Sequence, residues 1–403
     1  IEEIKEHLRN VDDVPLRVPT FTDSTPSTAT AMIKILRDYG DKVAVLGSSI
    51  VNENASVFFA ADVAVAIQPK SGASFAVDED STLSNKDSLR YSGTGALLKG
   101  NNAFFGLQIA AALNSIGVSL SLYSDEIESL EVILQQSRRL LINYKQGMLF
   151  ALTSQLTITL LVTLSSLLPL PDIFFSAYIL WFFWVLVPLM LIPMMCTPAQ
   201  NNIMELIPAK FDEENKSYYK KESKNTFFYI LLRCLVNALL VLTIAIVALA
   251  SISNVPLKSF FWQRDRLTFS SAAISATQAL SYLGLAWILL WTGLTYLYRR
   301  NSIFQQAHNN YWWSFFAFTA LCLEILYGEV IVQGQTDASE KLFTKFSWML
   351  APGWASWIIF LLSPIVIITV SESTKASDRV SHQKHMRRLR ILFETKLGMW
   401  SPR

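Results

Sequence analysis

The sequence has few charged residues, and this shortage narrows the classes of protein to which it can belong. Of its 403 residues, only 16% are charged, whereas 52% are hydrophobic. Soluble domains carry about 25% charged residues, so we expect part of this chain to lie in lipid. The net charge of +2 lacks the excess of basic residues that binding to nucleic acid requires, so no nucleic-acid partner is expected.

Cysteine is also scarce, and its placement excludes two kinds of site. Cys196, Cys234 and Cys322 are far apart and lie in or beside apolar runs. This spacing fits neither a disulfide framework nor a zinc site, and it favours packing among apolar residues. The sequence begins at Ile1, with neither an initiator Met nor a signal-peptide pattern, so we expect it to be a piece of a longer protein.

Long apolar runs are the most prominent feature of the second half. A helix needs about 20 mostly apolar residues to cross a bilayer. Six segments meet this condition, namely 147–168, 173–196, 227–252, 274–298, 312–333 and 349–371. The segment 104–123 is also apolar on average, but it contains Gln108, Asn114, serines and glycines. We therefore expect a helix and a strand of a soluble domain there.

The basic residues around the six segments predict their orientation in the membrane. The loops at 197–225 and 299–311 and the chain beyond residue 371 contain fifteen Lys and Arg residues, whereas the connections on the opposite side contain five. Short loops rich in Lys and Arg stay on the cytosolic side. Both termini are therefore expected in the cytosol, with residues 372–403 as a basic cytosolic tail.

The part before the apolar segments is expected to be a partial cytosolic α/β domain at 1–124, because short strands alternate with helices from 1 to 77. Residues 78–102 are rich in Ser, Asn, Gly and charge, which is typical of a flexible loop. From 125 to 146 apolar residues recur at helical spacing, and the pattern continues into the first apolar segment. The predicted fold is thus mostly α, with a partial α/β unit, a stalk helix and six transmembrane helices within 147–371.

The turn after the predicted strand at 43–46 has the composition of a ligand loop. Turns that follow a buried strand and begin with Gly often present ligands to a metal or a phosphate. Two interpretations remain open: the turn is a weak oxygen site for a metal ion or a phosphate, or Ser48 or Ser49 caps the next helix. The candidate residues of the first interpretation are Gly47, Ser48, Asn52, Glu53 and Asn54.

The order of α/β unit, stalk and six spans resembles the carboxyl-terminal half of a P-type cation-transporting ATPase. The Pro-led run from Phe21 is similar to the phosphorylation domain of these pumps, FFAADVAVAI from Phe58 to their ADIGIAM strand, and ILW at Ile179 to the start of a membrane helix. The resemblance is closer to the transmembrane protein 94 family, divergent relatives of these pumps, through LGSS from Leu46 and FETKLGM from Phe393.

The family resemblance implies a function that composition alone does not. A carboxyl-terminal portion of such a protein would help to move Mg²⁺ from the cytosol into the endoplasmic reticulum and would lie in that membrane as a multi-pass protein. Mg²⁺ would be the transported ion and would also act with ATP in the complete protein. The phosphorylated Asp would lie upstream, so no catalytic residue is expected within this chain.

The sequence also departs from the pumps. Ser48 stands where their loop has an Asp that holds Mg²⁺, and Ala29 stands where a basic residue usually cradles the phosphate. Loss of a metal ligand weakens phosphoryl transfer, which depends on positioning and charge neutralisation. Whether ATP is hydrolysed therefore stays open. The alternative hypothesis is a pseudo-ATPase membrane scaffold or regulatory protein that transports nothing.

Polar residues within the predicted spans are candidates for an ion pathway, because they are rare in membranes and usually functional. Glu324 and Glu329 are five positions apart and point about 140° from one another, so they cannot share a helix face. Asp172 is expected either to line the lumenal exit or to cap the second span. Pro188 should kink that span and free backbone carbonyls. The full set of candidates is Gln155, Thr157, Asp172, Pro188, Glu324 and Glu329.

Overall fold

The chain forms two compact units. The computed structural model describes residues 25–38, 42–68, 109–123, 128–168, 170–200, 203–204, 213–256, 269–303, 310–335 and 346–398. The predicted flexible loop at 78–102 lies outside these residues. One unit comprises Ile1–Leu134 and Pro208–Tyr218, and the other comprises Gln135–Ile207 and Tyr219–Arg403.

The first unit contains a small parallel sheet. Strands β1 (Ala44–Ser48), β2 (Val63–Gln68) and β3 (Leu120–Tyr123) pair in that order. Both pairings are parallel. Parallel neighbours need a crossover connection, and helix α3 (Asn54–Ala60) supplies it between β1 and β2. The predicted α/β unit is confirmed, including the strand expected near the end of 104–123.

Two helices form the core of this unit with the sheet. Helix α2 (Pro26–Asp38) begins with Pro26, which the first helical position accepts because its backbone N–H would have no partner there anyway. It buries Ile33 and Ile35. Phe58 of α3 packs with Ala64 of β2, the central strand, which is paired along both of its edges.

Six helices are long and apolar enough to cross a membrane. The prediction of six spans is confirmed. The second span is built from three consecutive pieces, and the others are single helices. In chain order they are α5 (Ser129–Leu167), then α6 (Ser176–Trp181), η4 (Phe182–Leu186) and α7 (Val187–Met195), followed by α8 (Glu213–Ile252), α10 (Ser271–Tyr296), α12 (Tyr311–Gln335) and α13 (Trp354–Gly398).

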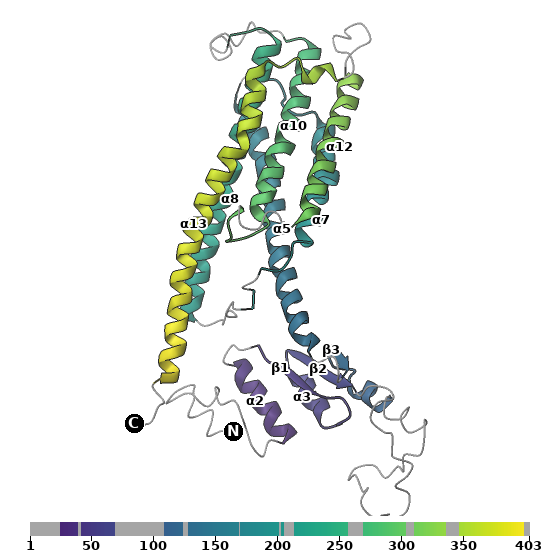
Figure 1. Ribbon diagram of the computed structural model, residues 1–403, viewed down its shortest axis with the longest axis vertical. Helices are drawn as coiled ribbons and strands as arrows, with labels where there is room; N and C mark the ends of the chain where they lie inside the picture. Colours follow the sequence, from purple (N-terminus) through teal and green to yellow (C-terminus); the bar gives the residue numbers. More distant parts are fainter. Residues whose placement is uncertain are drawn as a thin grey trace, which may run out of the picture. The chain divides into compact units, whose positions relative to one another are not determined.

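Helix α10 is the central helix of the bundle and lies between α8 and α12 (Figure 1). In its most apolar stretch 89% of the residues are buried, compared with 28–50% for the other five spans. Small residues let neighbouring helices approach it closely. A Cβ atom on Gly284, for example, would lie 3.3 Å from Ile244 of α8. The three cysteines are free: Cys234 is buried as expected, but Cys196 and Cys322 are exposed.

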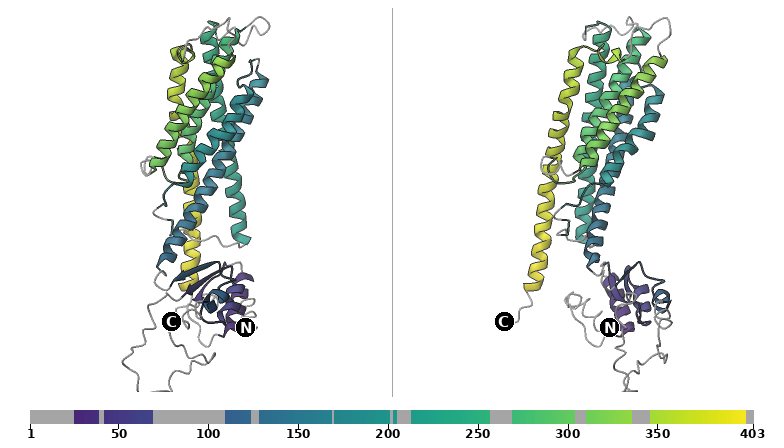
Figure 2. Two further views of the ribbon diagram at one scale, coloured as in Figure 1. Left: turned by 90° about the vertical axis from the view of Figure 1, so that its right-hand side faces the viewer. Right: turned by 45° about the vertical axis from the view of Figure 1, so that its right-hand side comes forward.

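The predicted continuity of stalk and first span is confirmed, because α5 runs from Ser129 to Leu167 without a break. Other helix ends differ from the sequence prediction, since α8 starts at Glu213 rather than at 227. Helix α13 starts at Trp354, after the short 3₁₀ turn η7 (Ser347–Met349), and extends past the ends of α10 and α12 (Figure 2). Its 45 residues span about 68 Å, more than twice the thickness of a bilayer core. The basic residues between 372 and 398 therefore continue the last span as one helix.

A cluster of ion pairs links α8 to α13 beyond the apolar part of the bundle. Arg299 and Arg300, which follow α10, both pair with Glu222 of α8. Arg300 Nε also lies 3.3 Å from Asp378 Oδ2 of α13. The four side chains are partly buried, and their two positive and two negative charges balance. Charge neutrality allows long polar helix ends to pack side by side.

Candidate functional site

The second span changes its winding near the middle. The π-helical turn η4 separates α6 from α7, and the Val187 N–H donates to the Phe182 carbonyl five residues earlier. Pro188 follows directly and has no N–H to donate to the preceding turn. Turns of this kind occur mostly as single bulges within α-helices and frequently at functional sites. The sequence predicted a kink at Pro188, and the structure has a local widening of the helix there.

Glu324 of α12 is a buried acid next to this span. Its side chain is only 2% exposed. Its Oε1 accepts a hydrogen bond of 3.2 Å from Nε1 of Trp181, which is the last residue of α6. Oε2 is buried and has no hydrogen-bond partner within the described ranges. No basic side chain among the described residues neutralises this carboxylate. A charged carboxylate is costly in a low-dielectric interior unless a cation or a ligand accompanies it, or unless it takes up a proton.

Four aromatic side chains lie around Glu324, and we call these five residues the aromatic cluster. Trp181 stacks on Tyr327, with ring centroids 4.2 Å apart. The Tyr178 ring lies 4.7 Å from the Tyr282 ring and 5.8 Å from the Tyr327 ring. All three tyrosines are near enough to Glu324 to interact with its charge. Helices α6, α10 and α12 thus each contribute to one buried polar centre.

Three buried oxygens of the aromatic cluster lack a well-formed hydrogen bond in the part of the chain that the structure describes. They are Glu324 Oε2 and the hydroxyls of Tyr178 and Tyr282, of which the Tyr282 hydroxyl lies near enough to Glu324 to interact with it as a donor. A buried polar group without a partner costs about 1–3 kcal/mol, so native interiors rarely contain several together. Tyr327 differs, because its hydroxyl donates to the Ala177 carbonyl at 3.1 Å. The free atoms are all oxygens, which are the ligands that hard cations and their hydration water prefer.

The two candidates on α5 lie on different sides of that helix. Thr157 is fully buried, and its hydroxyl donates to the Thr153 carbonyl at 2.7 Å. The Thr153 hydroxyl lies 2.8 Å from the Tyr296 hydroxyl of α10. Gln155 lies on the exposed face. Residues two positions apart on a helix point about 200° from each other, so only one of this pair faces the interior.

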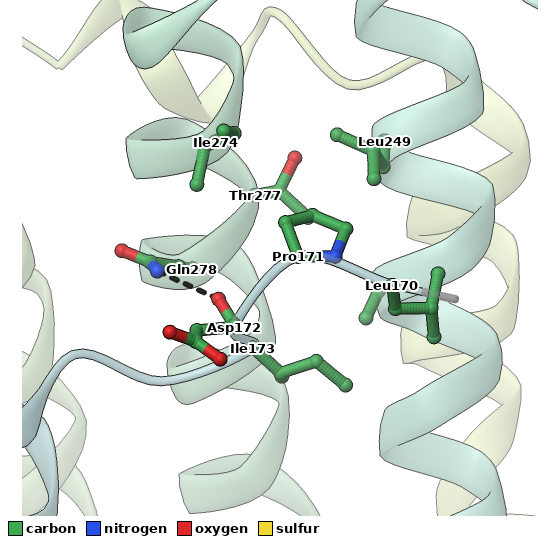
Figure 3. A pocket seen from close by; sticks show the side chains of 9 residues that line it. Leu170, Pro171, Asp172, Ile173, Leu249, Ile274, Thr277 and Gln278 are labelled. Carbon is green, nitrogen blue, oxygen red and sulfur yellow. Dashed lines mark hydrogen bonds between the residues drawn. The ribbon is translucent and has the colours of Figure 1, made fainter. Parts of the chain in front are cut away.

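Asp172 lies in the connection before α6, where it lines a small pocket (Figure 3). Its main-chain carbonyl accepts a hydrogen bond from Gln278 Nε2 at 2.7 Å. The predicted capping role of Asp172 is wrong, because the helix begins at Ser176 and Phe175 is its N-cap, without a side-chain bond. The pocket is mostly apolar, and its lining residues are Leu170, Pro171, Asp172, Ile173, Ala245, Leu249, Ile274, Thr277 and Gln278.

Glu329 holds a different part of the bundle. Its Oε2 accepts hydrogen bonds from the Phe346 N–H at 3.0 Å and from Trp348 Nε1 at 2.8 Å. Its Oε1 accepts from Gln333, one turn further along α12. Glu329 therefore anchors the segment that leads into α13. The five-residue separation from Glu324 places the two acids in separate environments, as their spacing indicates.

The turn after β1 is closed by hydrogen bonds from polar side chains to backbone carbonyls. Asn54 Nδ2 donates to the Ser48 carbonyl at 3.0 Å. The buried Ser49 hydroxyl donates to the Ile67 carbonyl at 3.0 Å, which ties the turn to the end of β2. Asn114 Nδ2 donates to the Ser49 carbonyl at 3.0 Å. Three side chains of this region are thus committed to holding the turn.

The interpretation that Ser48 or Ser49 caps the next helix is wrong. Helix α3 has Glu53 as its N-cap, and no side chain bonds to the free N–H groups there. The Ser48 hydroxyl instead accepts a hydrogen bond from the Ile50 N–H at 3.3 Å. Both serines therefore shape the turn itself rather than the helix start.

The remaining candidates of this turn do not converge. Gly47 packs under the ring of Phe58, where a Cβ atom would lie 3.2 Å from the ring carbon. Asn52 and Glu53 are exposed. Within the described stretches of the chain, no group of three or more His, Cys, Asp or Glu side chains is arranged to hold a metal ion.

Six apolar helices and a small parallel α/β unit define a multi-pass membrane protein. Over its whole length the chain is similar to transmembrane protein 94 of Mus musculus, at 27% identity over 431 residues, and of Homo sapiens, at 26% identity. The chain spans 30% of the length of these curated relatives. No protein-family model matches it. The resemblance to transmembrane protein 94 that the sequence predicted is confirmed by these alignments.

The sequence alone did not identify the tyrosines of the aromatic cluster. A signal was present, because Tyr178 and Trp181 are three residues apart, as are Glu324 and Tyr327. This spacing places each pair on one face of a helix. A tyrosine inside an apolar run also carries a hydroxyl that needs a partner. The sequence does not tell which faces of α6, α10 and α12 meet, so the cluster becomes visible only in the fold.

Proposed function

We propose that this chain forms the membrane part of a P-type-ATPase-like transporter that moves Mg²⁺ from the cytosol into the endoplasmic reticulum. The observation that carries the proposal is Glu324, an acid buried among three spanning helices with one unpartnered oxygen. Acids inside a membrane bundle are rare and mark ion pathways. A bound cation supplies the positive charge that this carboxylate lacks. The choice of Mg²⁺ and of the endoplasmic reticulum follows from the family resemblance.

Two features of the bundle suit it to transport. The π-helical turn at Phe182–Leu186 follows Trp181 directly, so a change of winding there would alter the bond that Trp181 makes to Glu324. Helix α5 is unbroken over 39 residues and is therefore suited to carry a movement along its length. The excess of basic residues on one side of the spans supports cytosolic positions for both termini.

The test is Mg²⁺ uptake by the complete protein in sealed lipid vesicles supplied with ATP outside. Glu324→Gln should reduce uptake at least about 30-fold, because removing a buried charge partner costs at least about 2 kcal/mol. Glu329→Gln is the matched control, because it makes the same change five residues further along α12. The amide oxygen of Gln can still accept the hydrogen bonds that anchor Phe346 and Trp348, so uptake should stay near the wild-type level. Wild-type protein that carries no Mg²⁺, or a Glu324→Gln variant that equals wild type, would refute the proposal.

The turn after β1 favours a second candidate function, a pseudo-ATPase scaffold that transports nothing. Ser48 occupies the position of the Mg²⁺-binding Asp of the pumps, and the neighbouring amides bond to the backbone. An acid-stable phosphoenzyme and Mg²⁺-dependent ATP hydrolysis in the complete protein distinguish the two. Their presence supports transport, and their absence together with absent Mg²⁺ uptake supports the scaffold.

A further inference from the structure

We infer that the aromatic cluster binds a divalent cation that keeps most of its hydration water, and that the hydroxyls of Tyr178 and Tyr282 hold that water. The inference rests on the proposed function and deepens it, because it states in which form the cation is carried and which residues select that form. The observation behind it is the meeting of one carboxylate and two tyrosine hydroxyls, contributed by three helices, in a buried place where these oxygens lack well-formed hydrogen bonds.

The number of protein ligands points to a hydrated ion. Glu324 is the one acid of the cluster, and no group of three or more acids, His or Cys that could hold a metal ion is found among the described residues. Mg²⁺ is six-coordinate, loses water reluctantly and usually keeps several waters when only one or two carboxylates bind it. A single carboxylate fills at most two of the positions. Ca²⁺ takes six to eight ligands and adapts to flexible geometry, so it gains less from a site of this kind.

Water molecules on a bound cation need acceptors around them, and the cluster provides these. Glu324 Oε1 already accepts from Trp181, which leaves Oε2 for the ion or for a water molecule. The Tyr178 hydroxyl has no hydrogen-bond partner in the described part of the chain. The Tyr282 hydroxyl lies near enough to Glu324 to direct its proton toward that carboxylate, and its oxygen keeps lone pairs that can accept from water. Both rings are at most 2% exposed, so bulk water does not compete for these hydroxyls. Polar groups left unbonded in such a place are available to a ligand.

The cluster is held in place by ring packing. Tyr282 packs edge-on against Phe174, with ring centroids 6.1 Å apart, and also lies against Tyr178. Tyr327 is fixed by its stack on Trp181 and by its bond to a backbone carbonyl. Rings held in this way lose little freedom when a ligand binds, and aromatic faces attract cations as well. The side chains of the site are therefore preorganised for binding the ion.

The experiment measures equilibrium binding of MgCl₂ and of CaCl₂ to the complete protein, for wild type, Tyr178→Phe and Tyr282→Phe. Each variant should weaken Mg²⁺ binding about five- to tenfold, the equivalent of one lost hydrogen bond, and Ca²⁺ binding less than about twofold. Hexaamminecobalt(III), which has the size of hydrated Mg²⁺ and does not exchange its ligands, should compete with Mg²⁺ on the wild type and only weakly on both variants.

Tyr298→Phe is the matched control, because the Tyr298 hydroxyl is also buried without a partner in the described residues but interacts with no member of the cluster. It should leave both affinities unchanged. The ratio of Mg²⁺ to Ca²⁺ affinity does not depend on how much protein is folded, so partial misfolding of a variant cannot mimic the effect.

Two results would overturn the inference while leaving the proposed function intact. One is wild-type protein that transports Mg²⁺ while both tyrosine variants bind it as tightly as wild type. The other is an equal loss of Mg²⁺ and Ca²⁺ affinity in the variants. Wild-type protein that neither binds nor transports Mg²⁺ would overturn both proposals together.

Discussion

The turn after β1 and the aromatic cluster differ in how far their polar side chains are hydrogen-bonded. In the turn, Asn54, Asn114 and Ser49 each donate a hydrogen bond to a backbone carbonyl. In the cluster, one oxygen of Glu324 and two tyrosine hydroxyls make no well-formed hydrogen bond among the described residues. Satisfied polar networks hold a structure rigid, whereas unsatisfied polar groups need a ligand, an ion or water. The difference favours the membrane bundle, and not the turn, as the place where a cation is bound.

The largest effect is expected from replacing the acid of the cluster by an apolar residue of similar size. Glu324→Leu should abolish Mg²⁺ uptake, yet change the free energy of unfolding by less than about 2 kcal/mol. Two effects on the free energy of unfolding oppose one another. Loss of the acceptor for Trp181 Nε1 destabilises the fold, whereas removal of a buried carboxyl group stabilises it. Uptake in vesicles and thermal unfolding in detergent measure the two quantities. Retained uptake would show that the cluster does not bind the transported cation. A strong loss of stability would show that Glu324 has a structural role.

A moderate effect on stability is expected in the turn. Asn54→Ala removes the donor to the Ser48 carbonyl and should destabilise the first unit by about 1–3 kcal/mol. Asn52→Ala is the control, because this exposed Asn in the same turn should change stability by no more than about 0.5 kcal/mol. Hydrogen exchange of peptides from β1 and β2 reports the difference. If Asn54→Ala instead weakens Mg²⁺ binding and leaves exchange unchanged, the turn is a ligand site.

A small effect is expected on the outer face of α5. Gln155→Ala should alter Mg²⁺ affinity less than about twofold, because this side chain is exposed while its neighbours Thr153 and Thr157 are buried. The measurement is the same equilibrium titration as for the cluster. A tenfold loss of Mg²⁺ affinity would instead indicate that the ion binds at the exposed face of α5.

The smallest effect concerns the acid stability of the first unit. The Val43 backbone N–H bonds to the Asp62 carboxylate at 3.1 Å, and this bond, with Arg37 and Lys42 nearby, lowers the pKa of Asp62 below its ordinary 3.8. A lowered pKa in the folded state gives stability that is present above about pH 4 and is lost as the pH falls below it. Asp62→Asn should flatten the pH dependence of unfolding between pH 6 and pH 3. An unchanged profile would show that this acid does not support the sheet.

Local signals in the sequence were enough for the spans and the strands. Apolar runs of about 20 residues predict membrane helices, and the short apolar runs that begin at Val43 and Val63 predict buried strands. These windows do not register the polar ends of helices, so they missed the start of α8 at Glu213 and the extension of α13 to Gly398. The predicted helix caps at Ser48 or Ser49 and at Asp172 were wrong for a different local reason. A small polar side chain near a helix start has several possible hydrogen-bond partners, and the sequence does not tell which one it takes.

The site was predictable only in part. Glu324 is conspicuous in an apolar run, and Pro188 marks a defect in a helix, so the sequence alone named both. Tyr178 and Tyr282 are more than one hundred residues apart and meet only because α6 and α10 pack together. The inward direction of Thr157 and the outward direction of Gln155 also depend on how α5 is rotated in the bundle, which no local pattern specifies.

One titration tests most directly whether the acid of the bundle, and not the turn, binds the cation. Mg²⁺ binding to the complete protein without nucleotide is compared for wild type, Glu324→Gln and a turn variant that combines Ser48→Ala, Asn52→Ala and Glu53→Gln. We expect Glu324→Gln to weaken binding at least about tenfold and the turn variant to stay within about twofold of wild type. Loss of binding in the turn variant with full affinity in Glu324→Gln would contradict the account.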